Sequence, residues 1–329
     1  MKSTHKKIDD LNIELTLEIG KDDYAEIERK KIAERKRTAD FKGFRKGMVP
    51  EGMIRRVYGD QILYESVNQV ISKGLQDFIE GEKLNVLGEP LGSENQPEVE
   101  WKDGADFTFV FDIALYPEVS VSADKKDSVP SYAVTVSAKD KAGMKENLKK
   151  FYESRKEEKS DEDIDKEVSE RLESEYKNEA DWRLSADIRR HFVEKAKVQL
   201  PEAFLKRWLS ASNEKVTPEQ MEQEFPRFLE DFRWQLVRGA FMKQYGFKVE
   251  KSDIEDAAKA YVTYQYAMYG MGSVPEEIIK NSVEQLLADG KQTDRLIEQV
   301  EDSKVLAKLK EEITITSKKI SSDKFRELK

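Results

Sequence analysis

The sequence has 329 residues, of which 37% are charged and 38% are hydrophobic. This length allows two or three domains with their own cores, and the composition favours a helix-rich chain with much surface over one compact globule. The absence of cysteine excludes disulfides and cysteine-ligated metals, and two histidines leave almost no material for a histidine-based metal site or a Ser-His-Asp triad.

Other function classes also lack support in the sequence. No run of about 18 apolar residues occurs, and the N-terminal residues contain no apolar signal-peptide stretch. There is no Gly-x-Gly-x-x-Gly sequence and no P-loop. We therefore expect a cytoplasmic protein with no membrane contact, no catalytic residues, no metal and no cofactor.

The first 115 residues show the two periodicities of an α+β domain. Alternating apolar residues predict a strand from Leu11 to Ile19. Helical spacing follows, first in a basic helix that ends at about Arg37 and then in a helix from Pro50 to Ile79. Alternation returns from Phe107 to Leu115, so residues 1–115 are expected to fold as one α+β domain.

A short loop between the two predicted helices, residues 41–50, combines glycine, an aromatic residue and cations. Two glycines can adopt positive φ and turn the backbone tightly, so that the side chains between them point outward. Arginine offers a planar fork of donors for phosphate or carboxylate, and phenylalanine offers a stacking face. Taken alone, these ten residues fit an ordinary solvated connection equally well. The candidate binding residues are Gly43, Phe44, Arg45, Lys46, Gly47 and Pro50.

The surroundings of this loop favour a binding role. From Arg29 to Arg56 the chain holds eleven Lys or Arg and three Asp or Glu, a local excess of +8 in a protein whose net charge is −9. A basic island on an acidic chain indicates nucleic acid or another polyanion as the partner.

The middle of the chain has few apolar residues. Residues 116–136, which include Pro117 and Pro130, are expected to form an extended linker, and a polar helix follows up to Tyr152. Residues 153–179 hold twelve acids and six bases, with a narrow apolar stripe at every fourth position. A solvated helix with one packing edge explains this pattern better than an acidic binding tail does.

From Ala180 onward the sequence predicts a series of helices. Capping boxes are predicted at Thr217–Gln220 and Ser252–Glu255, and Ile313 and Ile315 form a short strand-like pair near the end.

The predicted domain organisation has three regions. The α+β domain occupies residues 1–115. A linker and the first helix of the C-terminal body follow over residues 116–152, and a mostly α-helical, elongated C-terminal domain occupies residues 153–329.

One segment of the C-terminal half is crowded with tyrosine and methionine. Six such residues fall within eleven positions, so they cannot all face one side of a helix and some must be exposed. Flexible methionine and amphipathic tyrosine suit a promiscuous apolar surface, although packing between helices is the favoured explanation of the pattern. The candidate substrate-binding residues are Tyr261, Tyr264, Tyr266, Met268, Tyr269 and Met271.

The loop and its surroundings resemble a known family. The sequence Gly43-Phe44-Arg45-Lys46-Gly47-Met48-Val49-Pro50, followed by Arg56-Val57-Tyr58-Gly59, is similar to the ribosome-binding signature of trigger factor, the family of bacterial ribosome-associated chaperones. The similarity extends through the strand from Phe107 to Leu115 and the Tyr116-Pro117-Glu118-Val119 sequence. A weaker likeness continues over the helical C-terminal half.

The resemblance implies a ribosome-associated, ATP-independent chaperone. In the family this loop docks beside the polypeptide tunnel exit, on a ribosomal protein and neighbouring rRNA, so Phe44, Arg45 and Lys46 would be the contact residues here. Met48 departs from the lysine usual at that place, and one cation fewer should weaken phosphate contact modestly. The helical C-terminal half would form arms and a cradle for nascent and unfolded polypeptides, and a homodimer of the free protein is left open.

A second departure from the family lies in the middle of the chain. Trigger factors usually insert a prolyl isomerase domain of about a hundred residues after the linker, a normal size for one domain. Only about thirty polar, helix-forming residues separate Phe151 from Trp182. That domain is therefore expected to be missing, and the isomerase activity of the family is not carried over. Two alternatives stay open, an RNA-binding protein that uses the Arg29 to Arg56 surface alone and a degenerate peptidyl-prolyl isomerase.

Overall fold

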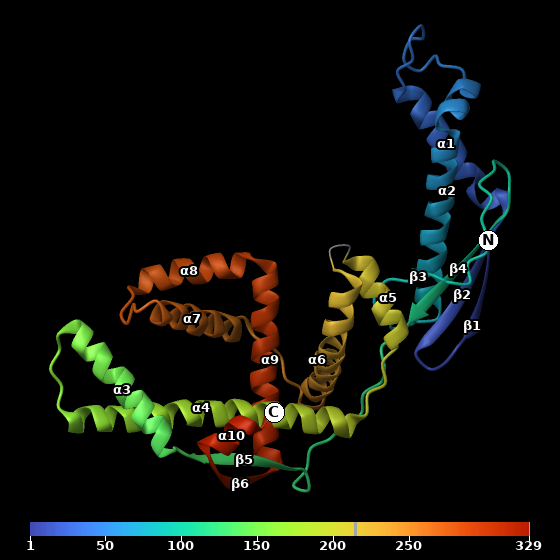
Figure 1. Ribbon diagram of the computed structural model, residues 1–329. Coiled ribbons are helices and arrows are strands. Elements are labelled where there is room, and N and C mark those ends of the chain that lie inside the picture. Colours follow the sequence, from blue (N-terminus) through green and yellow to red (C-terminus); the bar gives the residue numbers. More distant parts are fainter. Residues whose placement is uncertain (214–215, 329) are drawn as a thin grey trace. The chain divides into compact units, whose positions relative to one another are not determined.

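The computed structural model describes residues 1–213 and 216–328 (Figure 1). Contacts divide the chain into two compact units. Unit 1 contains Met1–Glu118 and Gln199–Leu229, and unit 2 contains Val119–Val198 and Glu230–Lys329. Each unit therefore joins segments that are far apart in the sequence.

Unit 1 contains an antiparallel four-stranded sheet. β2 pairs with β4 along its whole length, and Leu15 lies opposite Phe111. The expected strands at residues 11–19 and 107–115 are therefore confirmed. No sequence pattern indicates β1, because its six residues are polar and all exposed. The strands, in the spatial order β1-β2-β4-β3, are β1 (Lys2–Lys7), β2 (Asn12–Ile19), β3 (Leu91–Gly92) and β4 (Phe107–Ala114).

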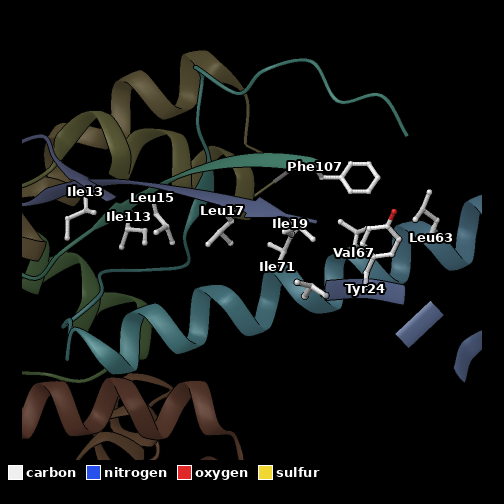
Figure 2. Packing of buried hydrophobic residues seen from close by; sticks show 11 residues of the cluster. Ile13, Leu15, Leu17, Ile19, Tyr24, Leu63, Val67, Ile71, Phe107 and Ile113 are labelled. Carbon is white, nitrogen blue, oxygen red and sulfur yellow. The ribbon is translucent and has the colours of Figure 1, made fainter. Parts of the chain in front are cut away.

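Two long helices pack beside this sheet. α1 (Lys21–Thr38) and α2 (Glu51–Gly81) contact each other, and α2 runs along β2. β2 turns alternate side chains toward α2, whose apolar residues recur every three or four positions (Figure 2). Burial of this apolar area, at about 25 cal/mol per Å², fixes α2 and the loop that precedes it. The buried core consists of Ile13, Leu15, Leu17, Ile19, Tyr24, Leu63, Val67, Val70, Ile71, Phe107 and Ile113.

A segment from the second half of the chain completes unit 1. α5 (Glu202–Ser212) and the first part of α6 (Pro218–Tyr245) belong to it. Arg207 donates hydrogen bonds to a carboxylate oxygen of Asp112 at 2.6 Å and to the carbonyl oxygen of Gly92 at 2.7 Å. A charge-assisted pair of this kind ties α5 to the edge of the sheet.

The compact units do not coincide with the expected domains. Residues 199–229 group with unit 1, whereas the sequence assigns them to a region over residues 153–329. Gly88 helps this packing, because at its φ of 73° a Cβ would lie 3.0 Å from the indole of Trp208. The boundaries 1–115, 116–152 and 153–329 stay a prediction about domains.

Unit 2 is built on long helices. α3 (Ala138–Arg155) and α4 (Asp161–Ala196) pack against each other. α4 buries one side chain at every fourth position from Ile164 to Phe192. The expected solvated helix with one packing edge is therefore confirmed, and the same stripe continues well beyond residue 179.

A parallel two-stranded sheet in unit 2 joins distant parts of the chain. β5 (Ser128–Thr135) pairs with β6 (Thr314–Ser321) over their whole length. The expectation of an extended linker over residues 116–136 is therefore wrong for β5. The partner strand of β5 lies at the other end of the sequence, and Pro130 within β5 favours a linker locally. No residue near β5 therefore indicates that it pairs with β6. The strand-like pair at Ile313 and Ile315 marks the start of β6.

The remaining helices confirm one of the two predicted capping boxes. Thr217 accepts a hydrogen bond from the backbone N–H of Gln220 at 3.3 Å, and the Gln220 side chain accepts one from Thr217 N–H at 3.0 Å. The predicted capping box at residues 252–255 is wrong, because α7 begins earlier, with Glu250 as its N-cap. The Asp253 carboxylate accepts a hydrogen bond from the backbone N–H of Glu250 at 2.8 Å. The confirmed box lies at the start of α6, and the helices that follow are α7 (Lys251–Met268), α8 (Glu276–Ala288), α9 (Gly290–Glu312) and α10 (Ser322–Glu327).

The α+β first part of the chain and its helical second part confirm the expected fold class.

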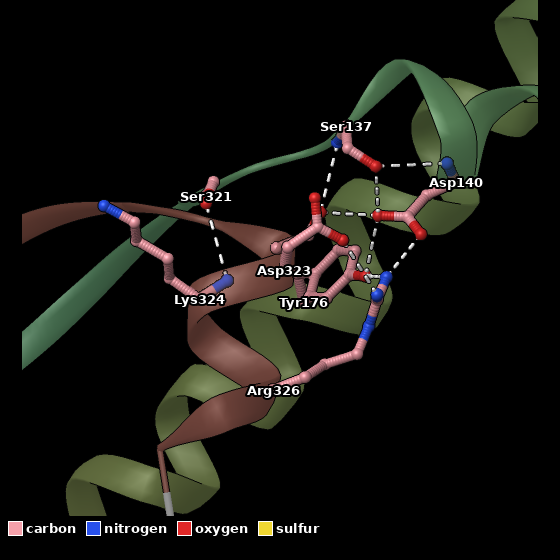
Figure 3. Close-up of polar contacts among 8 residues, drawn as sticks. Ser137, Asp140, Tyr176, Ser321, Asp323, Lys324 and Arg326 are labelled. Atoms are coloured by element: carbon pink, nitrogen blue, oxygen red, sulfur yellow. Dashed lines mark hydrogen bonds and ion pairs between the residues drawn. The ribbon is translucent and has the colours of Figure 1, made fainter.

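A polar network around Asp140 attaches the end of the chain to α3 and α4 (Figure 3). The Asp140 carboxylate accepts hydrogen bonds from Ser322, from Ser137 at 2.9 Å and from Tyr176 at 3.1 Å, and it forms an ion pair with Arg326. The bond from Ser322, followed by those from Ser137, Arg326 and Tyr176, holds the pKa of Asp140 well below its ordinary value.

We expect Asp140→Asn to lower the free energy of unfolding by about 2 kcal/mol at neutral pH, because charge-assisted hydrogen bonds are lost. Since the folded pKa of Asp140 is depressed, its contribution is complete above the ordinary value of 3.8 and is lost as the pH falls below it. The difference between wild type and variant, measured by denaturant unfolding, should therefore narrow below about pH 4. Asp256→Asn, on an exposed face of α7, is the control. A difference that does not change with pH would contradict this assignment.

Candidate functional site

The loop between α1 and α2 presents its central side chains to solvent. Gly43 and Gly47 have φ values of 93° and 83°, which glycine adopts without strain. Two turns follow from these angles, closed by hydrogen bonds from Phe44 N–H to the Phe41 carbonyl at 3.0 Å and from Met48 N–H to the Arg45 carbonyl at 2.9 Å. Of the candidate residues, Gly43, Phe44, Arg45, Lys46 and Pro50 are exposed, and Gly47 is half-buried.

The two ends of the loop are anchored in a small core. Val49 is fully buried there, together with Ile32 and Ile54. Phe41 packs edge-on against the ring of Tyr58 with their centroids 6.1 Å apart. The tip is therefore free while its base is fixed, which limits the entropy lost when the tip binds a partner.

Much of the basic island stays available for a partner. Lys31 is paired with Glu65 at 3.1 Å and lowers the pKa of that carboxyl, and Arg55 is paired with Glu28 at 2.7 Å. Across residues 1–213 and 216–328, Arg45 and Lys46 form no such ion pair, like six other cations of the island. Unpaired cations beside an exposed aromatic ring suit phosphate and carboxylate groups. The six others are Arg29, Arg35, Lys36, Arg37, Lys42 and Arg56, and the Arg35 guanidinium lies over the ring of Tyr58.

Sequence reasoning missed an apolar rim around this tip. Met48, Met53 and Val57 are exposed, and Val57 leaves 57% of its surface in solvent. The spacing of Met53 and Val57, four apart on α2, was a usable signal, because Ile54 already supplies the buried side of that turn. The loop therefore combines cations with a partly apolar surface.

The tyrosine and methionine segment ends α7 and forms the turn to α8. Gly270, at a φ of 78°, closes α7 together with a hydrogen bond from Met271 N–H to the Tyr266 carbonyl at 3.0 Å. The Tyr266 hydroxyl pairs with Ser282 at 3.0 Å, so this residue joins α7 to α8. The other five candidates are exposed, Tyr269 to 81%. They are Tyr261, Tyr264, Met268, Tyr269 and Met271.

This segment is also free of charge. No charged residue occurs from Ala260 to Pro275, a stretch of sixteen residues in a chain of which 37% is charged. An uncharged, flexible and exposed surface can contact apolar segments of many shapes.

A hollow of about 440 Å³ lies between α7 and α8. Ile279, Val283 and Leu287, spaced four apart on α8, form its apolar side, and none of the residues of α8 is fully buried. Sequence reasoning missed this side of α8, although the spacing was visible. The other six residues that line the hollow are charged, so its apolar side is a narrow strip with charged residues around it.

Among the described residues, no helix is long and apolar enough to cross a membrane. None of their His, Cys, Asp and Glu side chains form a group of three or more that could hold a metal ion.

Two family models match this chain. The one described as bacterial trigger factor protein matches residues 1–151, and the one described as probable trigger factor, C-terminal domain, matches residues 180–329. One solved structure comes from work described as "Promiscuous Substrate Recognition in Folding and Assembly Activities of the Trigger Factor Chaperone". Its alignment with this chain covers 95% of this chain and 100% of the chain in that structure, with a TM-score of 0.54 and 14% sequence identity. That likeness concerns the fold.

Curated relatives match over part of their length. Trigger factor from Francisella tularensis subsp. novicida is 30% identical over 152 residues, which are 46% of this chain and 34% of that protein. Trigger factor from Francisella philomiragia is 32% identical over 46% of this chain and 33% of that protein, and the one from Aliivibrio fischeri is 33% identical over 39% and 28%. The chain therefore matches about a third of the length of these relatives.

The conformation of the loop can be tested by substitution at a glycine. We expect Gly47→Ala to lower the free energy of unfolding by about 1 kcal/mol, because its φ of 83° is strained for alanine although no atom lies within 4 Å of the added Cβ. Gly52→Ala, in α2 and equally uncrowded, should raise it by up to about 1 kcal/mol. Denaturant unfolding measures both, and destabilisation by both variants would contradict the role of φ.

Proposed function

Because this chain belongs to the trigger factor family, we propose that it is a cytoplasmic, ribosome-associated chaperone that binds nascent and unfolded polypeptides without ATP. The observation that carries this proposal is the loop at residues 41–50, whose base is buried and whose cationic, aromatic tip is exposed.

Docking at the ribosome would use this tip. Phe44 supplies an exposed ring, and Arg45 and Lys46 supply charges for rRNA phosphates or acidic side chains of a ribosomal protein near the tunnel exit. The apolar rim at Met48 and Val57 suits a protein surface better than RNA alone. A partner that combines protein and RNA therefore fits the tip better than naked RNA does.

Client binding would use the uncharged turn between α7 and α8. Burial of its tyrosine and methionine side chains against an apolar client segment stabilises the complex by about 25 cal/mol per Å². Several weak contacts of this kind permit release without a nucleotide. A client held near the ribosome has a high effective concentration, so high affinity is not needed.

The proposal includes no prolyl isomerase activity. The two family matches leave residues 152–179 unmatched, and the structure places the end of α3 and the first half of α4 there. These residues form a helical pair with a packed edge and no enclosed pocket for a proline ring among the cavities described.

The docking claim predicts that Phe44→Ala/Arg45→Ala/Lys46→Ala lowers affinity for ribosomes by at least about tenfold in cosedimentation. The matched control removes one exposed aromatic ring and two exposed cations from α3, as Lys139→Ala/Lys141→Ala/Phe151→Ala, and should bind like the wild type. Unchanged cosedimentation of the loop variant would contradict docking through this tip.

A gain of binding would separate phosphate contact from protein contact. Met48→Lys should tighten binding and steepen the dependence of log affinity on log salt by up to about 0.9, because it adds one cation. Equal affinity of the wild type for naked rRNA and for ribosomes would favour the alternative RNA-binding function.

The client-binding claim predicts that Tyr264→Ser/Met268→Ser/Tyr269→Ser weakens suppression of aggregation of a denatured client, with little loss of thermal stability because all three side chains are exposed. Phe151→Ser/Trp182→Ser, which removes two other exposed aromatic side chains, is the control. Suppression by the triple variant equal to that by the wild type would overturn the assignment of the client-binding surface.

A refolding assay tests the isomerase alternative. A client whose refolding is limited by proline isomerisation should refold no faster with the protein present, and acceleration would favour a degenerate isomerase.

A further inference from the structure

We propose that the outer edge of β6 is a docking site for the main chain of an extended, carboxylate-bearing segment of an unfolded polypeptide. This inference rests on the proposed chaperone function and adds a second mode of client capture, by backbone pairing. It uses different residues and different forces from the apolar turn between α7 and α8.

The sheet that contains β6 is open on one side. β5 and β6 are its only strands among the described residues, and α4 packs against β5 (Figure 1). β5 therefore lies between a helix and a strand, while β6 has a free edge. An edge of this kind carries unpaired N–H and C=O groups that can accept another strand.

The register shows which groups of β6 point to that edge. Thr314 N–H donates to the carbonyl of Asp127 at 2.8 Å, so the backbone of Thr314 and of every second residue after it turns toward β5. The residues between them, Ile315, Ser317 and Lys319, turn their N–H and C=O groups outward. In the described part of the chain, none of these three takes part in a backbone hydrogen bond outside the sheet.

The edge is also accessible to a large partner. All residues from Ile315 to Lys319 are exposed, including the apolar Ile315 at 38%. A strand that packs one face on a core buries alternate side chains, whereas these five successive residues, like all six of β1, are exposed. The edge from Ile315 to Lys319 is therefore accessible to an extended peptide.

The charge of the sheet selects the occupant. Lys318 and Lys319 are the only charged residues of β5 and β6, and they form no ion pair with the carboxylates that the structure describes. A segment with Asp or Glu complements them, whereas a cationic segment is repelled. A second copy of β6 would bring four lysines together at one junction. The edge therefore favours an acidic client segment over another copy of this chain.

A backbone site of this kind suits a chaperone because every unfolded segment has the same main chain. Pairing at an edge uses main-chain hydrogen bonds for affinity and side chains for selectivity. The three outward residues allow only a few such bonds, so binding is weak and reversible.

The probe for this site is a short synthetic peptide of alternating valine and glutamate, added to the full chain. We expect it to slow amide hydrogen exchange at Ile315, Ser317 and Lys319. The same peptide with N-methyl groups along one edge, or with lysine in place of glutamate, should bind at least about tenfold more weakly. Absence of protection at the three amides by the glutamate peptide would overturn the proposal.

Two variants test separately the two interactions proposed at this edge, main-chain hydrogen bonding and charge attraction. Ser317→Pro removes one outward N–H that the β5 ladder does not use, and should weaken peptide binding about fivefold, whereas Ser317→Ala should not. Lys318→Glu/Lys319→Glu should reverse the preference between the glutamate and lysine peptides even if the proline variant fails to fold. An unchanged preference would overturn the charge argument.

The remaining outcomes separate this inference from the proposed function. Protection of the three amides that rises with protein concentration in the absence of peptide would show a second copy as the occupant and overturn the proposal. Suppression of client aggregation without protection of these amides would overturn edge docking alone. Failure of the wild type to suppress aggregation would overturn the chaperone function on which the inference rests.

Discussion

The pairing of β6 with β5 is the constraint on which unit 2 depends. It joins Thr314–Ser321 to Ser128–Thr135. The chain therefore leaves this small sheet at β5, passes through the helices from α3 to α9 and returns to the sheet at β6. Closing so long a stretch of chain costs conformational entropy, although that cost grows only slowly with length. The ladder, the packing of Phe325 on Tyr176 and the Asp140 network together offset it. The two exposed surfaces of unit 2 depend on this closure.

The loop at residues 41–50 and the turn after α7, two of the surfaces proposed to bind partners, share one design. Each has a base fixed by buried residues or a hydrogen-bonded turn and a tip whose side chains touch little else. Val49 fixes the loop in unit 1, and Gly270 with Tyr266 fixes the turn of α7. A fixed backbone reduces the entropy lost on binding, while free side chains adapt to different partners. This design suits weak but broad recognition of the proposed partners.

An element of this fold could be predicted from the sequence where its own residues carry the pattern that forms it. β2, β4, α1, α2 and the stripe of α4 were predictable, because each carries its own period of apolar residues. β1 and β5 were not, because β1 is polar throughout and β5 needs a partner nearly two hundred residues away. At the candidate sites, the glycine loop was visible as a sequence pattern. The sequence did not show which tyrosines of the segment at residues 261–271 are packed and which are exposed. Tyr266 differs from its neighbours only through its contact with Ser282, which depends on the packing of α8.

Charge separates the tasks of these surfaces. The loop is cationic, the turn after α7 has no charge over sixteen residues, and the β6 edge has two lysines on an otherwise neutral sheet. The chain has 37% charged residues, and the charges that surround the exposed tyrosine and methionine side chains oppose self-association. Since a polyanion is attracted to the loop and repelled by most of an acidic chain, it is directed to one end of unit 1. An apolar segment finds an uncharged exposed surface at the turn after α7 in unit 2, so the two proposed partners would use different residues.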